Sequence, residues 1–220
     1  MVLILMGAPG AGKGSQSREL ARRFGLTQIS TGDILRGHMA DGTEIGVRIT
    51  DMMNAGELVP DDLIVGIVRE RVREGDCRDG FILDGFPRTL AQAKALPGIL
   101  AETGNVLDTV ISIEVPDAVI LYRMNGRLVC PACGAMFHVH YYPPRKAGVC
   151  DSCGSALTLR EDDKAHTVLS RLATYHERTQ PIIDYYGGEG LLLRVDGVGD
   201  KAAITAEIVS GLEAGVKWPK

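Results

Sequence analysis

The sequence lacks an excess of positive charge and a long apolar run. Its 24 Lys and Arg residues face 28 Asp and Glu, for a formal net charge of −4, which is not typical of a general nucleic-acid binder. No apolar run has the roughly 20 residues that span a bilayer. The first apolar run ends at Met6 without a small-residue cleavage site, so we expect no signal peptide. We therefore expect a cytoplasmic protein with no nucleic-acid or membrane partner.

Cysteine is scarce, and four of the five cysteines form two Cys-x-x-Cys pairs. Cys130 and Cys133 are separated from Cys150 and Cys153 by the sixteen residues 134–149. This spacing is typical of a tetrahedral Zn²⁺ site rather than of disulfides, and it favours a reducing compartment. Four thiolates leave no open position on the metal, so the predicted site is structural.

Three other residues near this pattern have weaker interpretations. His138 and His140 are alternative metal ligands, but we interpret them as packing residues or part of a solvated turn. Cys77 is interpreted as an unpaired thiol near a loop.

Five short apolar runs alternate with amphipathic segments. They predict strands at residues 2–6, 27–29, 81–83, 110–115 and 191–195, and the order indicates an α/β fold with a doubly wound, five-stranded parallel sheet. From Leu128 to about Asp163 the composition changes to cysteines, aromatics, prolines and glycines, which predicts an inserted mini-domain. The ligand crevice of such a sheet lies at the carboxyl ends of its strands.

Capping and breaking signals predict the helices between these strands. Asp61 and Asp62 are interpreted as capping residues of a helix that starts at Pro60 and ends at Gly75. Pro97 is expected to interrupt a helix that begins near Thr89, and Pro181 to bend one that runs from about Lys164 to Tyr186. Further helices are expected after the first strand up to Gly25, in short pieces between Ser30 and Gly56, after Pro116 and from Lys201.

A glycine-rich segment follows the first strand and opens a helix. Gly7-x-x-x-x-Gly12-Lys13 satisfies most of the Walker A pattern, although Gly14 stands where a Ser or Thr is usual and Ser15 is the nearest hydroxyl. Backbone N–H groups, the Lys13 charge and the helix dipole together suit a polyphosphate. Because the motif lies between a strand and a helix, we prefer nucleoside triphosphate binding to an incidental glycine turn.

Four motifs extend this pattern into a family resemblance. They are Gly7-Ala-Pro-Gly-Ala-Gly-Lys-Gly-Ser-Gln16, Ile29-Ser-Thr-Gly-Asp-Ile-Leu-Arg36, Leu58-Val-Pro-Asp-Asp-Leu-Ile64 and Gly80-Phe-Ile-Leu-Asp-Gly-Phe-Pro-Arg88. Together with Gly126-Arg127, Arg160-x-Asp162-Asp163 and Arg171, they closely resemble the adenylate kinases of the bacterial type with a long, four-cysteine lid. In that family Gly-Lys-Gly-Thr/Ser is the usual sequence at the positions of Gly12–Ser15.

The resemblance implies the reaction Mg·ATP + AMP ⇌ 2 ADP in a kinase of nucleotide biosynthesis, and it places the predicted structural Zn²⁺ in the lid. Because no extensive exposed apolar stripe is evident in the sequence, we expect a monomer. ATP would contact Gly10, Ala11, Gly12, Lys13, Gly14, Ser15, Arg127, Met136, Phe137 and Gly199. AMP would contact Thr31, Arg36, Glu57, Leu58, Val59, Gly85, Phe86, Pro87, Arg88, Gln92, Arg160 and Arg171. The implied division of the chain is a P-loop core (1–29, 60–125 and 164–220), a helical NMP-binding subdomain (30–59) and a zinc-binding lid (126–163).

Transfer of a phosphoryl group between two anionic nucleotides needs positioning and cations more than a covalent nucleophile. We expect this role for Lys13, Arg88, Arg123, Arg127, Arg160 and Arg171. Asp84 follows an apolar strand and is a candidate to orient Mg²⁺ through water, with a capping role as the alternative. Asp162 and Asp163 either pair with arginines of the lid or cap the following helix.

Two groups of alternatives stay open at this point. One is a different nucleoside monophosphate kinase, which would accept UMP or CMP or use GTP. The other is a noncatalytic nucleotide switch or zinc-ribbon binding module, although the set of arginines argues against it because a sensor needs only one nucleotide site.

Overall fold

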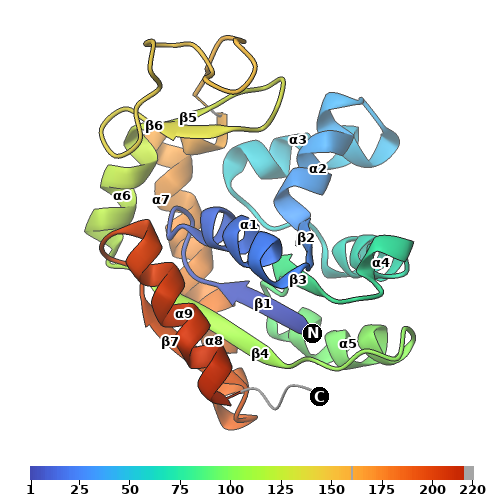
Figure 1. Ribbon diagram of the computed structural model, residues 1–220. Coiled ribbons are helices and arrows are strands. Elements are labelled where there is room, and N and C mark those ends of the chain that lie inside the picture. The colour runs from blue at the N-terminus through green and yellow to red at the C-terminus, as the bar shows by residue number, and fades with distance from the viewer. Residues whose placement is uncertain (160, 216–220) are drawn as a thin grey trace.

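A central parallel sheet with helices on both faces organises the computed structural model, which describes residues 1–159 and 161–215 (Figure 1). The strand order is β2-β3-β1-β4-β7 and every pairing is parallel. The strands are β1 (Val2–Met6), β2 (Thr27–Ser30), β3 (Phe81–Asp84), β4 (Thr109–Glu114) and β7 (Leu192–Asp196). The predicted five-stranded, doubly wound α/β fold is confirmed.

Successive strand residues feed two separate cores. In β1, Ile4 belongs to the core on one face of the sheet, while Leu3 and Leu5 belong to the core on the other. The first core is covered by α4 (Asp61–Val72), α5 (Leu90–Ala101) and α8 (Gln180–Gly188); the second by α1 (Lys13–Phe24), α6 (Asp117–Asn125), α7 (Ala165–Thr174) and α9 (Lys201–Gly215). Burial on both faces explains why these strands read as continuous apolar runs.

The register of the sheet brings three loops to one edge. Asp84, the last residue of β3, is paired with Leu5 of β1 on one side and with Ser30 of β2 on the other. The glycine-rich loop, the start of α2 (Thr31–Ala40) and the Gly85–Arg88 segment therefore leave the sheet side by side. This edge is the crevice that the strand order predicts for a ligand.

Two excursions from the core lie above this edge (Figure 1). Helices α2 and α3 (Glu44–Ala55) form one of them and pack against each other. The other lies between α6 and α7 and contains the antiparallel strands β5 (Arg127–Val129) and β6 (Met136–His138), followed by a short 3₁₀ turn, η2 (Glu161–Asp163). We call the segment 126–163 the lid segment; its predicted boundaries, like those of the other subdomains, stay predictions.

The expectation for Pro97 needs correction, and the segment around Pro181 is more complex than a single helix. Helix α5 continues through Pro97, because burial of Leu96, Ile99 and Leu100 offsets the hydrogen bond that proline cannot donate. The expected helix 164–186 is three segments: α7, the π-helical turn η3 (Tyr175–Thr179) and α8. Pro181 lies in the first turn of α8, and the N–H of Gln180 reaches back five residues to the carbonyl of Tyr175, so the wider turn accommodates the proline.

Among the residues described in the structure, no helix combines the length and apolar character needed to cross a membrane.

Candidate active site

The glycine-rich loop places the Lys13 ammonium at the centre of the site. Gly12 has a φ of +99°, in the left-handed region that favours glycine, and it ends the loop where α1 begins. The Nζ atom of Lys13 donates hydrogen bonds to the carbonyl oxygens of Gly7 at 2.7 Å and Ala8 at 2.9 Å. The loop thus holds its own cation, while Ser15 stands in the first turn of α1.

The electrostatics of Lys13 show that cations converge here. Burial lowers the pKa of Lys13 to about 8, with Asp84 opposing that shift and with Arg88, Arg171 and Arg127 adding to it. These arginines come from three different elements, so the field at Lys13 is set by tertiary structure. The resulting cluster of positive charge is suited to phosphate groups.

Asp84 lies beside the loop. Burial raises the pKa of its carboxyl group, while the charges of Lys13 and Arg88 oppose that change. A Cβ atom at Gly14 would lie 3.4 Å from Asp84 Oδ2 and 3.8 Å from the methyl group of Met136, so Gly14 is where the loop, β3 and β6 approach one another.

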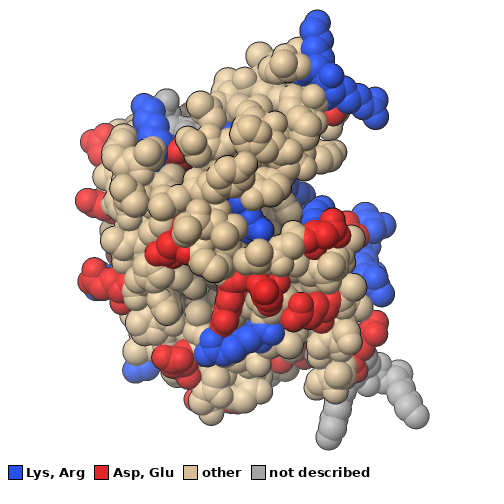
Figure 2. Space-filling model, turned by 90° about the vertical axis from the view of Figure 1, so that its left-hand side faces the viewer, with Lys and Arg blue, Asp and Glu red and all other residues tan. Residues whose placement is uncertain are grey.

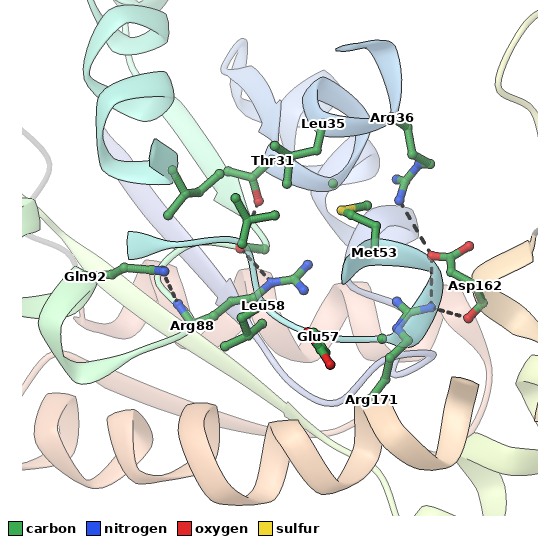
Figure 3. A pocket seen from close by; sticks show the side chains of 15 residues that line it. Thr31, Leu35, Arg36, Met53, Glu57, Leu58, Arg88, Gln92, Asp162 and Arg171 are labelled. Carbon is green, nitrogen blue, oxygen red and sulfur yellow. Dashed lines mark hydrogen bonds and ion pairs between the residues drawn. The ribbon is translucent and has the colours of Figure 1, made fainter. Parts of the chain in front are cut away.

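A cleft of about 570 Å³ opens next to this loop, between α2, α3 and the Gly85–Arg88 segment (Figure 3). We call it the first cleft. Its walls are apolar in part and cationic in part. The lining residues are Thr31, Gly32, Leu35, Arg36, Met53, Gly56, Glu57, Leu58, Val59, Ile64, Gly85, Arg88, Gln92, Asp162 and Arg171. Most residues that the sequence assigned to one nucleotide are therefore in one place.

A second cleft, of about 520 Å³, adjoins the first. It is lined by Lys13 and by Gly7 and Pro9 of the glycine-rich loop, and it shares Arg88 and Arg171 with the first cleft. Figure 2 shows Lys and Arg side chains beside a hollow in the surface, while Asp and Glu are spread over the body below it. The sequence-predicted phosphate loop and the Thr31 and Arg88 segments thus face a common space.

Close packing around Gly85 positions Arg88. Gly85 has a φ of +85°, and a Cβ atom there would lie 2.8 Å from Thr31 Oγ1 and 3.0 Å from Arg88 Nη2. Thr31 Oγ1 and Arg88 Nε both donate to the Gly85 carbonyl, at 2.8 and 2.9 Å. Thr179 Oγ1 of the π-helical turn donates to the backbone carbonyl of Arg88 at 2.9 Å. Sequence reasoning missed Thr179, because nothing in its neighbourhood predicts a wide turn.

The acidic pair at the end of the lid segment contacts arginines. Arg127 Nε donates to Asp163 at 2.6 Å, and Arg171 Nη1 donates to Asp162 at 3.0 Å. Asp162 also lies 3.9 Å from Arg36 of α2. The N-cap of α7 is Lys164, and no side chain caps it. Of the two open interpretations, pairing with arginines is confirmed.

Arg171, like Lys13, is largely enclosed by the protein. Burial lowers its pKa to about 10, against the opposing charge of Asp162 and with Arg127 and Arg88 adding to the shift. It stays charged at neutral pH, so a fixed positive charge lies where the two clefts meet.

The interpretation of Asp61 as a helix cap is wrong. Pro60 is the N-cap of α4, and no side chain bonds there. The Asp61 carboxylate instead accepts hydrogen bonds from Thr89 Oγ1 and Gln92 Nε2 of α5. An acidic residue in the first turn of a helix is common because of the helix dipole, so the sequence alone did not signal this contact.

The four paired cysteines come together in the lid segment. Their Sγ atoms all lie within 4.8 Å of one another, with 3.4 Å between Cys130 and Cys153 and 3.6 Å between Cys133 and Cys150. Tetrahedral coordination with metal–sulfur bonds of about 2.3 Å requires sulfur separations of about 3.8 Å. The geometry is therefore compatible with zinc.

Two matching turns hold these cysteines. In the first, the Gly134 N–H donates to the Cys130 carbonyl at 2.9 Å, and in the second the Gly154 N–H donates to the Cys150 carbonyl at the same distance. Hydrogen bonds from Ser155 lower the pKa of Cys153 to about 6, which favours the thiolate that a metal ion needs.

The other residues around the lid segment have distinct environments. Phe137 is buried with Cys130 and Cys150, so its side chain supports the lid segment itself. His138 is buried, and its Nδ1 accepts the backbone N–H groups of His140 and Tyr141, which confirms the packing interpretation. Cys77, the fifth thiol, is buried against Arg71, and burial raises its pKa to about 11.

The predicted catalytic residue Arg123 and the predicted ATP contact Gly199 lie on neighbouring segments. Arg123 of α6 donates from Nη2 to the carbonyl of Gly197 at 2.8 Å, which ties α6 to the loop that contains Gly199. Arg160, predicted on both the catalytic and the AMP side, lies outside the described residues.

Comparisons with known proteins agree with this geometry. Residues 5–191 match the family model described as adenylate kinase. The chain is 52% identical over 212 residues to an adenylate kinase of Caldicellulosiruptor saccharolyticus and 53% identical over 212 residues to one of Caldicellulosiruptor bescii. In both cases the match covers 96% of this chain and 99% of the relative. An adenylate kinase of Archaeoglobus fulgidus is 47% identical over 213 residues, 97% of this chain and 98% of the relative. The chain belongs to the adenylate kinase family.

Proposed function

We propose that this protein catalyses the reversible, Mg²⁺-dependent reaction ATP + AMP ⇌ 2 ADP. One observation carries the proposal: Arg88 and Arg171 line both clefts, so phosphates bound in either cleft meet the same two cations. A phosphoryl group can then pass from one nucleotide to the other without leaving the cationic cluster. Membership of the adenylate kinase family supports the same reaction.

The second cleft is the proposed ATP side. Gly10, Ala11, Gly12, Lys13, Gly14 and Ser15 would hold the phosphates, because the loop N–H groups and the start of α1 favour anions. Arg127 and Met136 would approach from the lid segment, and Arg123 and the Gly199 loop from α6 and β7. Since the Phe137 side chain is buried among cysteines, we assign its part in ATP contact to its backbone.

The first cleft is the proposed AMP side. Its arginines, Arg36, Arg88 and Arg171, suit a phosphate, and its apolar wall suits a purine. Thr31, Glu57, Leu58, Val59, Gly85 and Gln92 line the same cleft, and Phe86 and Pro87 belong to the segment that carries Arg88. We keep Arg160 in this set as a prediction from sequence.

The chemistry follows from these positions. An in-line transfer spreads negative charge over the equatorial oxygens of the moving phosphoryl group, and Lys13, Arg88 and Arg171 converge where that charge forms. Arg127 lies close enough to act on the same field. The lid segment would exclude water, which is the competing acceptor.

Two metal ions are part of the proposal. Mg²⁺ would neutralise phosphate charge, and Asp84 is placed beside Lys13 to orient it through water. Zn²⁺ would occupy the four-cysteine cluster in a structural role, since four sulfur ligands leave no position for substrate. The thiols also favour a cytoplasmic location, where they stay reduced. Both clefts are lined by one chain, so a monomer is sufficient for activity.

The test is a coupled assay that measures ADP formed from ATP plus AMP, with UMP, CMP and GTP as competitors. We expect ADP formation to require AMP and to be little affected by the other nucleotides. Preferential use of UMP or CMP would identify another nucleoside monophosphate kinase. Nucleotide binding without ADP formation would instead identify a noncatalytic nucleotide switch.

A further inference from the structure

A partly buried hydrogen-bonded group links the starts of α4 and α5 to the first cleft. One oxygen of the Asp61 carboxylate accepts the Thr89 hydroxyl at 3.0 Å, and the other accepts Gln92 Nε2 at 2.7 Å. Gln92 Oε1 in turn accepts the backbone N–H of Arg88 at 2.7 Å. Gln92 is only 2% exposed, yet it lines the cleft. Its amide is therefore held from both ends at the cleft wall.

These two partners allow one orientation of the amide. A carboxylate only accepts hydrogen bonds, so the NH₂ end of Gln92 must face Asp61. A backbone N–H only donates, so the oxygen of Gln92 must face Arg88. Rotation of the amide by 180° would break both bonds and bring like groups together, which is costly for a buried side chain.

The fixed Gln92 amide keeps one N–H and one oxygen lone pair free to bind a ligand. Because the amide cannot rotate, the positions of this donor and this acceptor on the cleft wall are fixed. Adenine is complementary to such an edge, because its ring N1 accepts a hydrogen bond and its 6-amino group donates one. Hypoxanthine presents the reverse order, since its N1–H donates and its 6-oxo group accepts. A freely rotating glutamine amide can pair with either base, whereas a fixed amide matches only one.

The distribution of charge in the cleft favours a base rather than a phosphate near Gln92. Figure 3 shows Gln92 on the opposite side from Arg36 and Arg171, with Arg88 between them. The lining also includes apolar Leu35 and Ile64. A nucleoside monophosphate with its phosphate on the arginines would extend its base toward Gln92.

We propose that Asp61 is a positioning residue for base selectivity: it holds the Gln92 amide in the orientation that selects a 6-aminopurine over a 6-oxopurine. The inference rests on the proposed function, because it takes the first cleft to be the AMP side. Asp61 itself does not line the cleft, so it acts through Gln92.

The main experiment compares AMP with inosine monophosphate (IMP) as phosphoryl acceptors for Asp61→Asn. The substitution removes the charge and one of the two accepting oxygens at position 61, so of the two bonds that orient the Gln92 amide only the one from the Arg88 N–H is kept at full strength. We expect the ratio of kcat/KM for AMP to that for IMP to fall about tenfold, the factor of roughly one hydrogen bond. The KM for ATP should stay unchanged. Asp62→Asn is the matched control, because exposed Asp62 lies next in the same helix turn and loses the same charge; its ratio should equal that of the wild type.

A second variant reverses the pairing. Asp61→Asn combined with Gln92→Glu restores an amide–carboxylate pair with opposite polarity, and the cleft wall then presents only acceptors to the base. Since adenine and hypoxanthine each present one donor and one acceptor at this edge, an acceptor-only wall does not distinguish them, and the AMP:IMP ratio should approach one. Calorimetric binding of AMP and IMP, measured below the melting temperature of each variant, gives the same ratio without turnover.

Two results would overturn the inference: an unchanged AMP:IMP ratio in Asp61→Asn, or an equal change in Asp62→Asn. If Asp61 had a purely structural role, its substitution would lower kcat/KM for AMP and for IMP by the same factor, and the AMP:IMP ratio would stay constant. Failure of the wild type to make ADP from ATP and AMP would reject the proposed function, while the binding ratio would still report on Asp61.

Discussion

The core and the lid segment are held together in different ways. The core has two large apolar clusters on opposite faces of the sheet. In the lid segment, by contrast, the buried cluster consists of Phe137 with Cys130 and Cys150. So small an apolar cluster cannot stabilise a segment of this size, which makes the four thiols its main source of order.

The same comparison separates stability from chemistry. In the core, Lys13 carries a charge that burial disfavours, so it serves the site at some cost to the fold. In the lid segment, the four cysteines are the proposed zinc ligands, which would serve the fold and leave no position on the metal for a substrate. Substitutions of the cysteines should therefore lower stability more than activity, and substitutions of Lys13 should lower activity more than stability.

The largest effect is expected for Cys130→Ser. Loss of one sulfur ligand should remove most of the metal-derived stability, which in zinc-finger peptides amounts to about 10 kcal/mol or more. Nucleotide chemistry should change less than thermal stability. Metal content of the purified protein and melting curves with and without chelator provide the measurement. Equal melting temperatures of the wild type with and without chelator would contradict this.

Lys13→Met should act in the opposite way. Removal of one charge-stabilising donor is expected to lower kcat by about 10²–10³-fold. The melting temperature should not fall, because the substitution removes a cation whose pKa burial lowers. Steady-state kinetics and calorimetry of the same preparation test both parts. A large loss of stability with retained kcat would reverse the assignment of roles.

Asp163→Asn probes the junction between the two regions. The Asp163 side chain is 1% exposed and pairs with Arg127 and Arg171. Breaking a buried pair leaves an uncompensated charge, so the free energy of unfolding should drop by about 3 kcal/mol. Asp33→Asn is the control, since Asp33 pairs with Arg36 at the surface and should cost less than about 1 kcal/mol. Equal losses in urea titrations would show that burial does not matter at this junction.

The smallest predicted effect concerns pH. Because the pKa of Lys13 is about 8, kcat/KM for Mg·ATP should decline above that pH as the free enzyme loses the proton, by up to about tenfold per pH unit. The sign for stability is opposite: between pH 8 and 10.5 the unfolded chain holds this proton and the folded chain does not, so the contribution of Lys13 to stability rises with pH. Lys13→Arg should move the descending limb of the activity profile to higher pH. A flat wild-type profile up to pH 10 would be inconsistent with a buried Lys13.

Local patterns predicted most of the core and of the cysteine cluster. Apolar runs such as Val2–Met6 predict strands buried on both faces, and Cys-x-x-Cys pairs predict a metal site. Both patterns are formed by residues that are close together in the sequence. The contacts of Asp61 and Thr179 could not be predicted in this way. Asp61 contacts residues 28 and 31 positions away, and Thr179 contacts a carbonyl 91 positions away. Helix α5 continues through Pro97 for the same kind of reason, since tertiary packing decides it.

The central claim is that the two clefts meet at Arg88 and Arg171. The most direct test of it uses ATP that is labelled in its γ-phosphate. If the two nucleotides face each other there, the label should move into the ADP formed from AMP, at the rate of ATP consumption and without appearing on the protein. Label released as inorganic phosphate in place of labelled ADP, or ADP formed at the same rate without AMP, would contradict the account.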